Sequence, residues 1–213
     1  MEEYSVYNDI SKRTNGEFYL GVCGPVRTGK STFIKKFMEM FVLPGIRDEN
    51  DRKRAMDELP QSAEGKTIMT TEPKFIPKEA VKINLFDGND IKVRMVDCVG
   101  YIVEDAGGLM EGERERMVMT PWSEEPMPFA KAAEYGTKKV IHDHSTIGIV
   151  ITTDGSFGDI SRQSYKAAED KTISELKSIG KPFIVIVNSA NPFGEKAKDV
   201  INEIKERTGV TPV

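Results

Sequence analysis

The chain has 213 residues, of which 38% are hydrophobic and 30% charged, and it carries a formal net charge of −4. This length and composition predict a globular protein with one sizeable core, and the acidic balance argues against non-specific binding to nucleic acid. With two cysteines and two histidines, neither a zinc site nor a disulfide framework is expected, and a reducing, cytoplasmic setting fits best.

The chain opens with a polar lead-in, residues 1–16, after which residues 17–213 are interpreted as one domain. The lead-in is too polar for a signal peptide, and no apolar run approaches the roughly 18 residues of a membrane span. Residues 18–24, FYLGVCG, predict a strand buried on both faces. A helix is expected over residues 30–44, because large apolar residues recur there at helical spacing: Phe33, Ile34, Phe37, Met38 and Phe41.

The next stretch, residues 45–80, is charged and interrupted by proline, and only residues 47–61 suggest a short helix. Regular structure resumes with two apolar segments, residues 81–86 and 91–97, on either side of the turn DGND. This pattern predicts an antiparallel β-hairpin.

Residues 100–130 are rich in Gly, Pro, Glu and Met. A stretch of this length exceeds an ordinary connection, so it is interpreted as a functional loop. We expect about half of its large apolar side chains to lie in the core, with the others facing a partner: Leu109, Met110, Met117, Met119, Trp122, Met127 and Phe129.

The carboxyl-terminal part alternates helices with strands. Helices are expected over residues 128–144, 162–180 and 194–209, strands over 146–153 and 182–188, and the beginning of a strand at 210–213. Together with the earlier elements, this order predicts an α/β fold with a mostly parallel sheet, one antiparallel hairpin and helices on both faces. Because the last strand is incomplete, we expect the chain to be part of a longer protein.

The segment GPVRTGKST matches G-x4-G-K-[ST], the Walker A phosphate-binding loop. A buried strand leads into it and an amphipathic helix follows, which is the context the motif requires. Backbone N–H groups and the helix N-terminus would surround phosphates, with Lys30 on the outer phosphates and Ser31 on Mg²⁺. All nine residues are therefore expected to contact a nucleotide: Gly24, Pro25, Val26, Arg27, Thr28, Gly29, Lys30, Ser31 and Thr32.

A phosphate loop also needs an acidic partner for Mg²⁺ at the end of a neighbouring strand. Asp97 ends the strand IKVRMVD, and Gly100 completes the pattern D-x-x-G. We expect Asp97 to hold a metal-bound water and the Gly100 amide to contact the γ-phosphate. Thr70 and Thr71, in GKTIMTTEP, are candidates for a further Mg²⁺ ligand and a γ-phosphate sensor, with Thr70 as the ligand.

This order of motifs resembles the translation-factor-related GTPase superfamily, in which a later strand ends in N-K-x-D. Here the corresponding strand ends in NSAN: Asn188 matches, whereas Ser189 and Asn191 replace the Lys and the Asp. An Asn side chain has one carbonyl acceptor, so the two-bond recognition of guanine is lost. The sequence therefore favours adenine, with a degenerate guanine site as the alternative.

The GTPase pattern also places a water-positioning Gln after D-x-x-G, and this sequence has Tyr101 there. A phenol does not supply an amide's donor and acceptor together. Hydrolysis is therefore expected to be slow, to use another group, or to need an assembled neighbour. Arg27 is either a solvated loop charge or a phosphate contact, in cis or across a subunit contact.

Taken together, five stretches resemble the stage IV sporulation protein A family, the coat morphogenetic ATPases of endospore-forming bacteria: LGVCGPVRTGKSTFIKKFME, DELPQSAEGKTIMTTEPKF, VDCVGY, TPWSEEPMPF and HSTIGIVITTDG. The resemblance covers essentially the whole chain. It implies an N-terminal ATPase domain on a GTPase-like P-loop NTPase fold, with ATP and Mg²⁺ bound and with Lys30, Asp97, Thr70 and Thr71 as its functional residues.

The resemblance further implies middle and C-terminal domains beyond these 213 residues, and ATP-dependent polymerisation on the forespore surface in the mother-cell cytoplasm. The implied partners are other copies of the protein, a small amphipathic membrane-bound sporulation peptide and other coat proteins. Contact with the membrane surface would be indirect.

Three functions stay open at this point. The first is an ATP hydrolase, producing ADP and phosphate slowly, whose cycle drives self-assembly. The second is a nucleotide-dependent switch or scaffold with little turnover, which Tyr101 in place of Gln favours. A kinase is a weaker third, because no site for a second substrate is visible.

Overall fold

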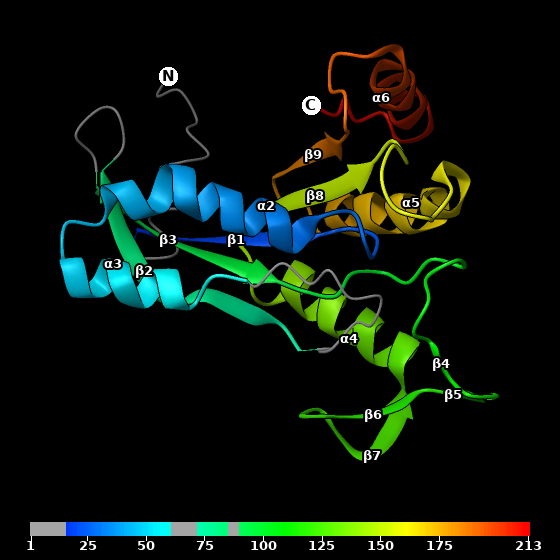
Figure 1. Ribbon diagram of the computed structural model, residues 1–213, viewed down its shortest axis with the longest axis horizontal. Coiled ribbons are helices and arrows are strands. Elements are labelled where there is room, and N and C mark those ends of the chain that lie inside the picture. Colours follow the sequence, from blue (N-terminus) through cyan, green and yellow to red (C-terminus); the bar gives the residue numbers. More distant parts are fainter. Residues whose placement is uncertain (1–15, 61–71, 85–89) are drawn as a thin grey trace.

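The computed structural model describes residues 16–60, 72–84 and 90–213 (Figure 1). Its centre is a five-stranded sheet in the order β2-β3-β1-β8-β9. β2 pairs antiparallel with β3, and the other three pairs, β3 with β1, β1 with β8 and β8 with β9, are parallel. This arrangement confirms the predicted α/β fold with a mostly parallel sheet and one antiparallel hairpin.

One face of the sheet is covered by the helical segment that follows β1 (Glu17–Cys23). The segment begins as α2 (Lys30–Phe37) and continues as the π-helical η1 (Met38–Val42) and the 3-10 turn η2 (Leu43–Gly45). Residues 30–44 are therefore helical, as predicted. Its fully buried side chains pack with those of the strands in a first core: Ile34, Met38 and Val42 with Val22, Met95 and Ile151.

The short helix expected within residues 47–61 is α3 (Glu49–Asp57). The carboxylate of Asp48 accepts a hydrogen bond from the N–H of Asp51 at 2.9 Å, which caps the helix at its start. Ala55 is the buried residue of α3 and belongs to the first core. α3 therefore extends the helical cover of this face.

The hairpin is longer than the sequence predicts. β2 (Lys74–Asn84) begins at Lys74, not at residue 81, and β3 spans Asp90–Asp97. The register between the two strands shifts between Ile76 and Val81, a stretch that contains Pro77. An edge strand tolerates a proline and an irregular register, and both features hide the strand pattern in the sequence.

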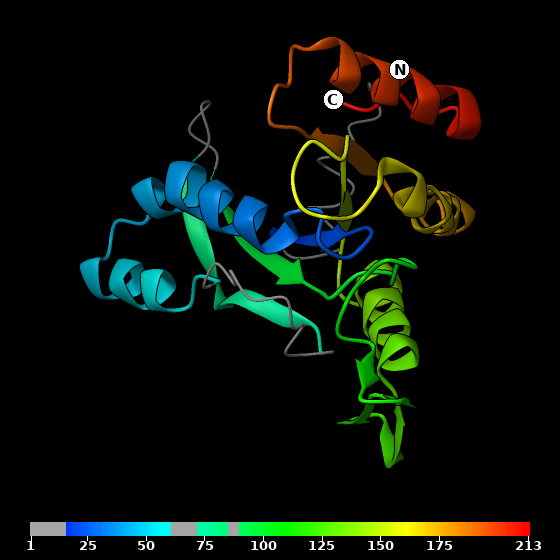
Figure 2. The same cartoon turned by 45° about the vertical axis from the view of Figure 1, so that its right-hand side comes forward.

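The interpretation of residues 100–130 as a loop is wrong in its central part. β4 (Met110–Glu111) pairs with β5 (Arg114–Glu115), and β6 (Met117–Thr120) pairs with β7 (Ser123–Pro128). These residues, 110–128, form a projecting segment that extends away from the central sheet in both ribbon views (Figures 1 and 2). The strands are too short to show an alternating pattern in the sequence.

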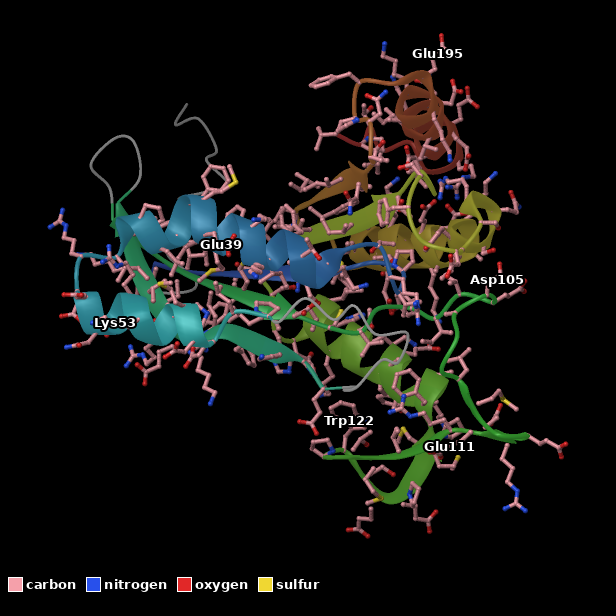
Figure 3. All side chains as sticks on the ribbon, viewed as in Figure 1. Glu39, Lys53, Asp105, Glu111, Trp122 and Glu195 are labelled. Atoms are coloured by element: carbon pink, nitrogen blue, oxygen red, sulfur yellow. The ribbon has the colours of Figure 1, made fainter. Side chains whose placement is uncertain are left out.

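The apolar side chains of the projecting segment are more exposed than expected. Of the seven side chains considered, Phe129 is buried, whereas Met110, Met117 and Met119 are 53%, 49% and 61% exposed. Charged side chains accompany them, such as the exposed Glu111 of β4, which is labelled in Figure 3. This segment therefore presents methionines to its surroundings.

The other face of the sheet carries α4 (Phe129–His142), α5 (Arg162–Ser178) and α6 (Glu195–Thr208). These helices alternate with β8 (Ile147–Thr153) and β9 (Phe183–Asn188), close to the expected bounds. Their buried side chains form a second core with strand residues: Val140, Tyr165, Leu176 and Ile204 with Cys23, Val150 and Val187. The two cores confirm that helices cover both faces of the sheet. In Figure 3, Lys53 marks α3 and Glu195 marks α6, and the two labels lie far apart.

Residues 210–213 are not a strand, but the last of them pairs with β9. The N–H of Val213 donates to the carbonyl of Val185, and the N–H of Val187 donates to the carbonyl of Val213, both at 2.9 Å. Val213 thus bonds to the residues on either side of Ile186, which is the hydrogen-bond pattern of a parallel strand pair. Among the residues described, no helix is long and apolar enough to cross a membrane.

Candidate nucleotide site

The predicted phosphate loop joins the carboxyl end of β1 to the amino terminus of α2. Its backbone has positive φ at Gly24 (122°), Arg27 (59°) and Gly29 (90°). A Cβ on Gly24 would overlap the carbonyl oxygen of Ile151 in β8, so glycine is required there. No side chain among the residues that the structure describes caps the start of α2, and the first N–H groups of a helix are a favourable place for an anion.

Lys30 lies inside this loop, with 5% of its surface exposed. Its ammonium donates a hydrogen bond to the carbonyl of Pro25, which also accepts one from the Thr28 hydroxyl at 3.0 Å. Burial lowers the pKa of Lys30, and the thiol of Cys98 and the carboxylate of Asp97 oppose that effect. A buried ammonium whose partner among the described residues is a backbone carbonyl has the chemistry to bind phosphate oxygens.

Ser31 and Asp97 are brought together from α2 and β3. The Ser31 hydroxyl donates to one carboxylate oxygen of Asp97 at 2.7 Å. The other oxygen, Oδ1, is buried and has no hydrogen-bond partner among the described residues. Burial raises the pKa of Asp97, against the hydrogen bond from Ser31 and the charge of Lys30. A hydroxyl and a carboxylate oxygen that lacks a partner are oxygen ligands of the kind Mg²⁺ takes, so this pair fits the ion.

Gly100 lies directly against the phosphate loop. Its φ is 95°, and a Cβ there would overlap the carbonyl oxygen of Gly24 and lie 2.7 Å from Nζ of Lys30. The next residue connects the two segments: the N–H of Tyr101 donates to Gly24 at 3.1 Å, and the N–H of Val26 donates to Tyr101 at 2.9 Å. The structure therefore brings Gly100 beside Lys30, at the place where the sequence predicts a γ-phosphate contact.

The remaining loop residues differ in what they present. The side chains of Val26 and Thr28 are buried, and Thr32 is exposed on the first turn of α2. Arg27 is partly buried, and its charge opposes the rise in pKa that burial causes at Tyr165 on α5. Thr70 and Thr71, the candidates for a further Mg²⁺ ligand and a γ-phosphate sensor, lie outside the described residues.

The side chain of Tyr101 does not face the phosphate loop. It is 3% exposed, and its hydroxyl donates to the carboxylate of Glu175 on α5. Its ring lies under the ammonium of Lys171, 4.6 Å from Nζ to the ring centroid. The phenol is thus engaged in the second core and is not placed to orient a water in the site.

Asn188, at the end of β9, supports the phosphate loop. Its amide nitrogen donates to the carbonyl of Thr28 at 3.1 Å, and a Cβ on Gly29 would overlap that nitrogen. The contact fixes the backbone just before Lys30. The Asn188 side chain therefore stabilises the conformation of the phosphate loop itself.

We predict that Asn188→Ala weakens binding of ADP and of a non-hydrolysable ATP analogue equally, by about fivefold. The change removes one neutral hydrogen bond, worth about 1 kcal/mol, from a loop that both nucleotides share. Isothermal titration of the two nucleotides measures the effect, and Asn202→Ala on the exposed side of α6 is the control. Unchanged affinity for both nucleotides would exclude this supporting role.

Asp154, which follows β8, was not singled out by sequence reasoning. Its side chain is 1% exposed and accepts hydrogen bonds from the Ser189 hydroxyl at 2.6 Å and the Ser156 N–H at 2.8 Å. Burial alone would raise the pKa of Asp154, but these bonds lower it. The residue in the place of the signature Lys, Ser189, is therefore held by a buried carboxylate. The sequence TTDGS is typical of a turn and gave no signal of this contact.

Comparison with known proteins gives a consistent result. The family model "Stage IV sporulation protein A, ATPase domain" matches residues 1–213. The chain is 56% identical over 207 residues to stage IV sporulation protein A of Bacillus subtilis (strain 168), covering 97% of this chain and 42% of that protein. It is 54% identical to stage IV sporulation protein A of Bacillus anthracis, covering 97% of this chain and 42% of that protein. It is 57% identical to stage IV sporulation protein A of Clostridioides difficile (strain 630), covering 95% of this chain and 41% of that protein. The chain thus spans less than half the length of these relatives.

Proposed function

The chain belongs to the stage IV sporulation protein A family as an ATPase domain, and from this premise we propose that it hydrolyses Mg-ATP at residues 24–32. The observation that carries the proposal is the convergence of Lys30, Ser31, Asp97 and Gly100 on one loop. A buried ammonium, a hydroxyl paired with a carboxylate, and a backbone N–H are the groups that phosphoryl transfer requires.

Each of these groups has a separate role in the proposal. Lys30 leaves the carbonyl of Pro25 and binds the outer phosphates. Ser31 would ligate Mg²⁺ and Asp97 would hold a water bound to it, and the ion would supply positive charge that neutralises the phosphates. Gly100 donates its N–H to the γ-phosphate, and Thr70 and Thr71 stay candidates for a further ligand and a sensor.

The proposed base is adenine. Ser189 and Asn191 replace the Lys and the Asp of N-K-x-D, the pattern in which the Asp reads guanine. The bonds that Ser189 makes with Asp154 and with the N–H of Asn191 support a fixed loop there. A neutral Asn at position 191 does not offer the two acceptor oxygens that guanine needs.

We predict that Asn191→Asp combined with Ser189→Lys moves the preference of the site toward GTP by about 2 kcal/mol, roughly 30-fold. The carboxylate supplies charge-assisted hydrogen bonds to guanine, and the lysine ammonium can pair with Asp154. Competition of ATP and GTP for a fluorescent nucleotide measures the shift. Asn191→Ala with the same Ser189→Lys is the control, because it lacks the carboxylate. A wild-type chain that binds GTP far more tightly than ATP contradicts the adenine pocket.

A nucleotide-dependent switch or scaffold with little turnover is the second candidate. The observation that favours it is the Tyr101 hydroxyl, which is bonded to Glu175 and leaves the position of the water-orienting Gln without an amide. Phosphate release measured across protein concentration separates the two candidates. Release that stays at the background rate at every concentration supports the switch.

In the longer protein, we propose that hydrolysis drives self-assembly at the forespore surface in the mother cell. A small amphipathic membrane-bound peptide and other coat proteins are the proposed partners. The exposed Met110, Met117 and Met119 of the projecting segment support an interaction surface, because exposed apolar groups favour association.

We predict that the 213-residue chain binds Mg-ATP without forming stable filaments, whereas a protein of the relatives' full length forms them after hydrolysis. Sedimentation of both proteins with ATP, with a non-hydrolysable analogue and without nucleotide checks this. Filaments from the 213-residue chain, or from the longer protein without nucleotide, would contradict the link between hydrolysis and assembly.

A further inference from the structure

Tyr101 belongs to two parts of the molecule at once. Its backbone pairs with the phosphate loop, through the N–H that donates to Gly24 and the carbonyl that accepts from Val26. Its side chain is buried in the second core, and its hydroxyl donates to Glu175 on α5. Because Gly100 is the preceding residue, the position of the Gly100 N–H depends on how Tyr101 is held.

The ring of Tyr101 is held from two helices. On α5, Lys171 lies over the ring and also pairs with Glu134 of α4 at 2.9 Å. Glu175, the acceptor of the phenol, lies 3.5 Å from Nε2 of His142 on α4. Burial and the nearby Glu175 carboxylate raise the pKa of Tyr101, so the phenol keeps its proton and stays a donor. A charge-assisted hydrogen bond of this kind is stronger than a neutral one.

Gly100 has little freedom in this arrangement. It adopts a positive φ and lies so close to Gly24 and Lys30 that a methyl group would not fit. The residue after Gly100 is held at two points. The backbone of Tyr101 is bonded to the phosphate loop, and its hydroxyl is bonded to Glu175 on α5.

We propose that Tyr101 and Glu175 are positioning residues, which hold Gly100 beside Gly24 and Lys30 so that its N–H can meet the γ-phosphate, and thereby make the site select ATP over ADP. The inference rests on the proposed function, because it requires Gly100 to meet the γ-phosphate. Because ADP has no γ-phosphate, a donor whose contact is with that phosphate strengthens the binding of ATP and leaves the binding of ADP unchanged. Loss of its positioning is therefore visible as loss of selectivity.

The test compares the affinities of the 213-residue chain for Mg-ADP and for Mg with a non-hydrolysable ATP analogue. Tyr101→Phe keeps the ring and removes the donor, so we expect about fivefold weaker binding of the ATP analogue and ADP binding within twofold of wild type. Glu175→Ala is expected to give the same change, whereas Glu175→Gln, which keeps an acceptor oxygen, retains most of the selectivity. The kcat for phosphate release should fall with the selectivity.

Tyr19→Phe is the matched control. Tyr19 also donates its hydroxyl to a glutamate, Glu17, but it lies on β1 before the strand reaches the loop. Its removal should leave the ratio of the two affinities unchanged, whatever it does to thermal stability. Melting curves of all variants report whether each one is folded.

The outcomes separate the inference from its premise. A wild-type chain that binds both nucleotides equally removes the γ-phosphate contact of Gly100, and with it that part of the proposed function. A selective wild type together with folded Tyr101→Phe and Glu175→Ala variants that stay equally selective overturns the positioning role. Equal weakening of both nucleotides in these variants also overturns it, since it indicates a general structural effect.

Discussion

Lys30→Ala is expected to weaken Mg-ATP binding about 100-fold, or about 3 kcal/mol, and to abolish phosphate release. Nζ of Lys30 is buried in the loop and has the Pro25 carbonyl as a backbone partner. Charge-assisted hydrogen bonds from a desolvated ammonium to phosphate oxygens are worth about 1.5–3 kcal/mol each. Isothermal titration with a non-hydrolysable analogue and a phosphate-release assay measure the two effects.

The loss should not come from unfolding. Keeping an ammonium buried opposes folding, so the melting temperature of Lys30→Ala should equal or exceed that of the wild type. Lys36→Ala is the control, because its side chain is 66% exposed on the same helix and pairs with Glu39 at the surface. Wild-type binding and turnover in Lys30→Ala would remove the phosphate loop from the proposed site.

Asp97→Asn is expected to lower kcat by about 10² to 10³-fold while nucleotide affinity changes only a few-fold. The substitution keeps the shape of the side chain and an acceptor for the Ser31 hydroxyl, but it removes the charge that would face Mg²⁺. Lys30 and the loop backbone stay in place to bind phosphates. Phosphate release at saturating Mg-ATP, with titration of the analogue, separates turnover from binding.

Asp143→Asn is the matched control, because Asp143 is exposed at the end of α4 and pairs with Lys139. It should leave kcat unchanged. Normal turnover by Asp97→Asn would assign Asp97 to turn structure and remove it from the proposed Mg²⁺ site.

The parts of the fold that the sequence predicts are those governed by local patterns. The buried strands β1, β8 and β9 are continuous apolar runs, and α2, α5 and α6 repeat apolar residues at helical spacing. The first part of β2 escapes prediction because Pro77 and a shifted register interrupt its pattern. The strands of the projecting segment are too short to have a pattern.

The candidate site divides in the same way. The phosphate loop and D-x-x-G are contiguous motifs, so the sequence identifies Lys30, Ser31, Asp97 and Gly100, and the structure brings these four residues together. Contacts between distant residues leave no local signal. The bond from Tyr101 to Glu175 spans 74 positions, and that from Asn188 to Thr28 spans 160.

The central claim, that Mg-ATP binds at residues 24–32 and is hydrolysed there, is tested most directly by a crystal structure with a non-hydrolysable ATP analogue and Mg²⁺. We predict the β- and γ-phosphates within the loop, Nζ of Lys30 moved from Pro25 to phosphate oxygens, Ser31 on the ion, and the Gly100 N–H on the γ-phosphate. Phosphates bound elsewhere, or a loop occupied with Lys30 still on Pro25 and the ion away from Ser31 and Asp97, would contradict the claim.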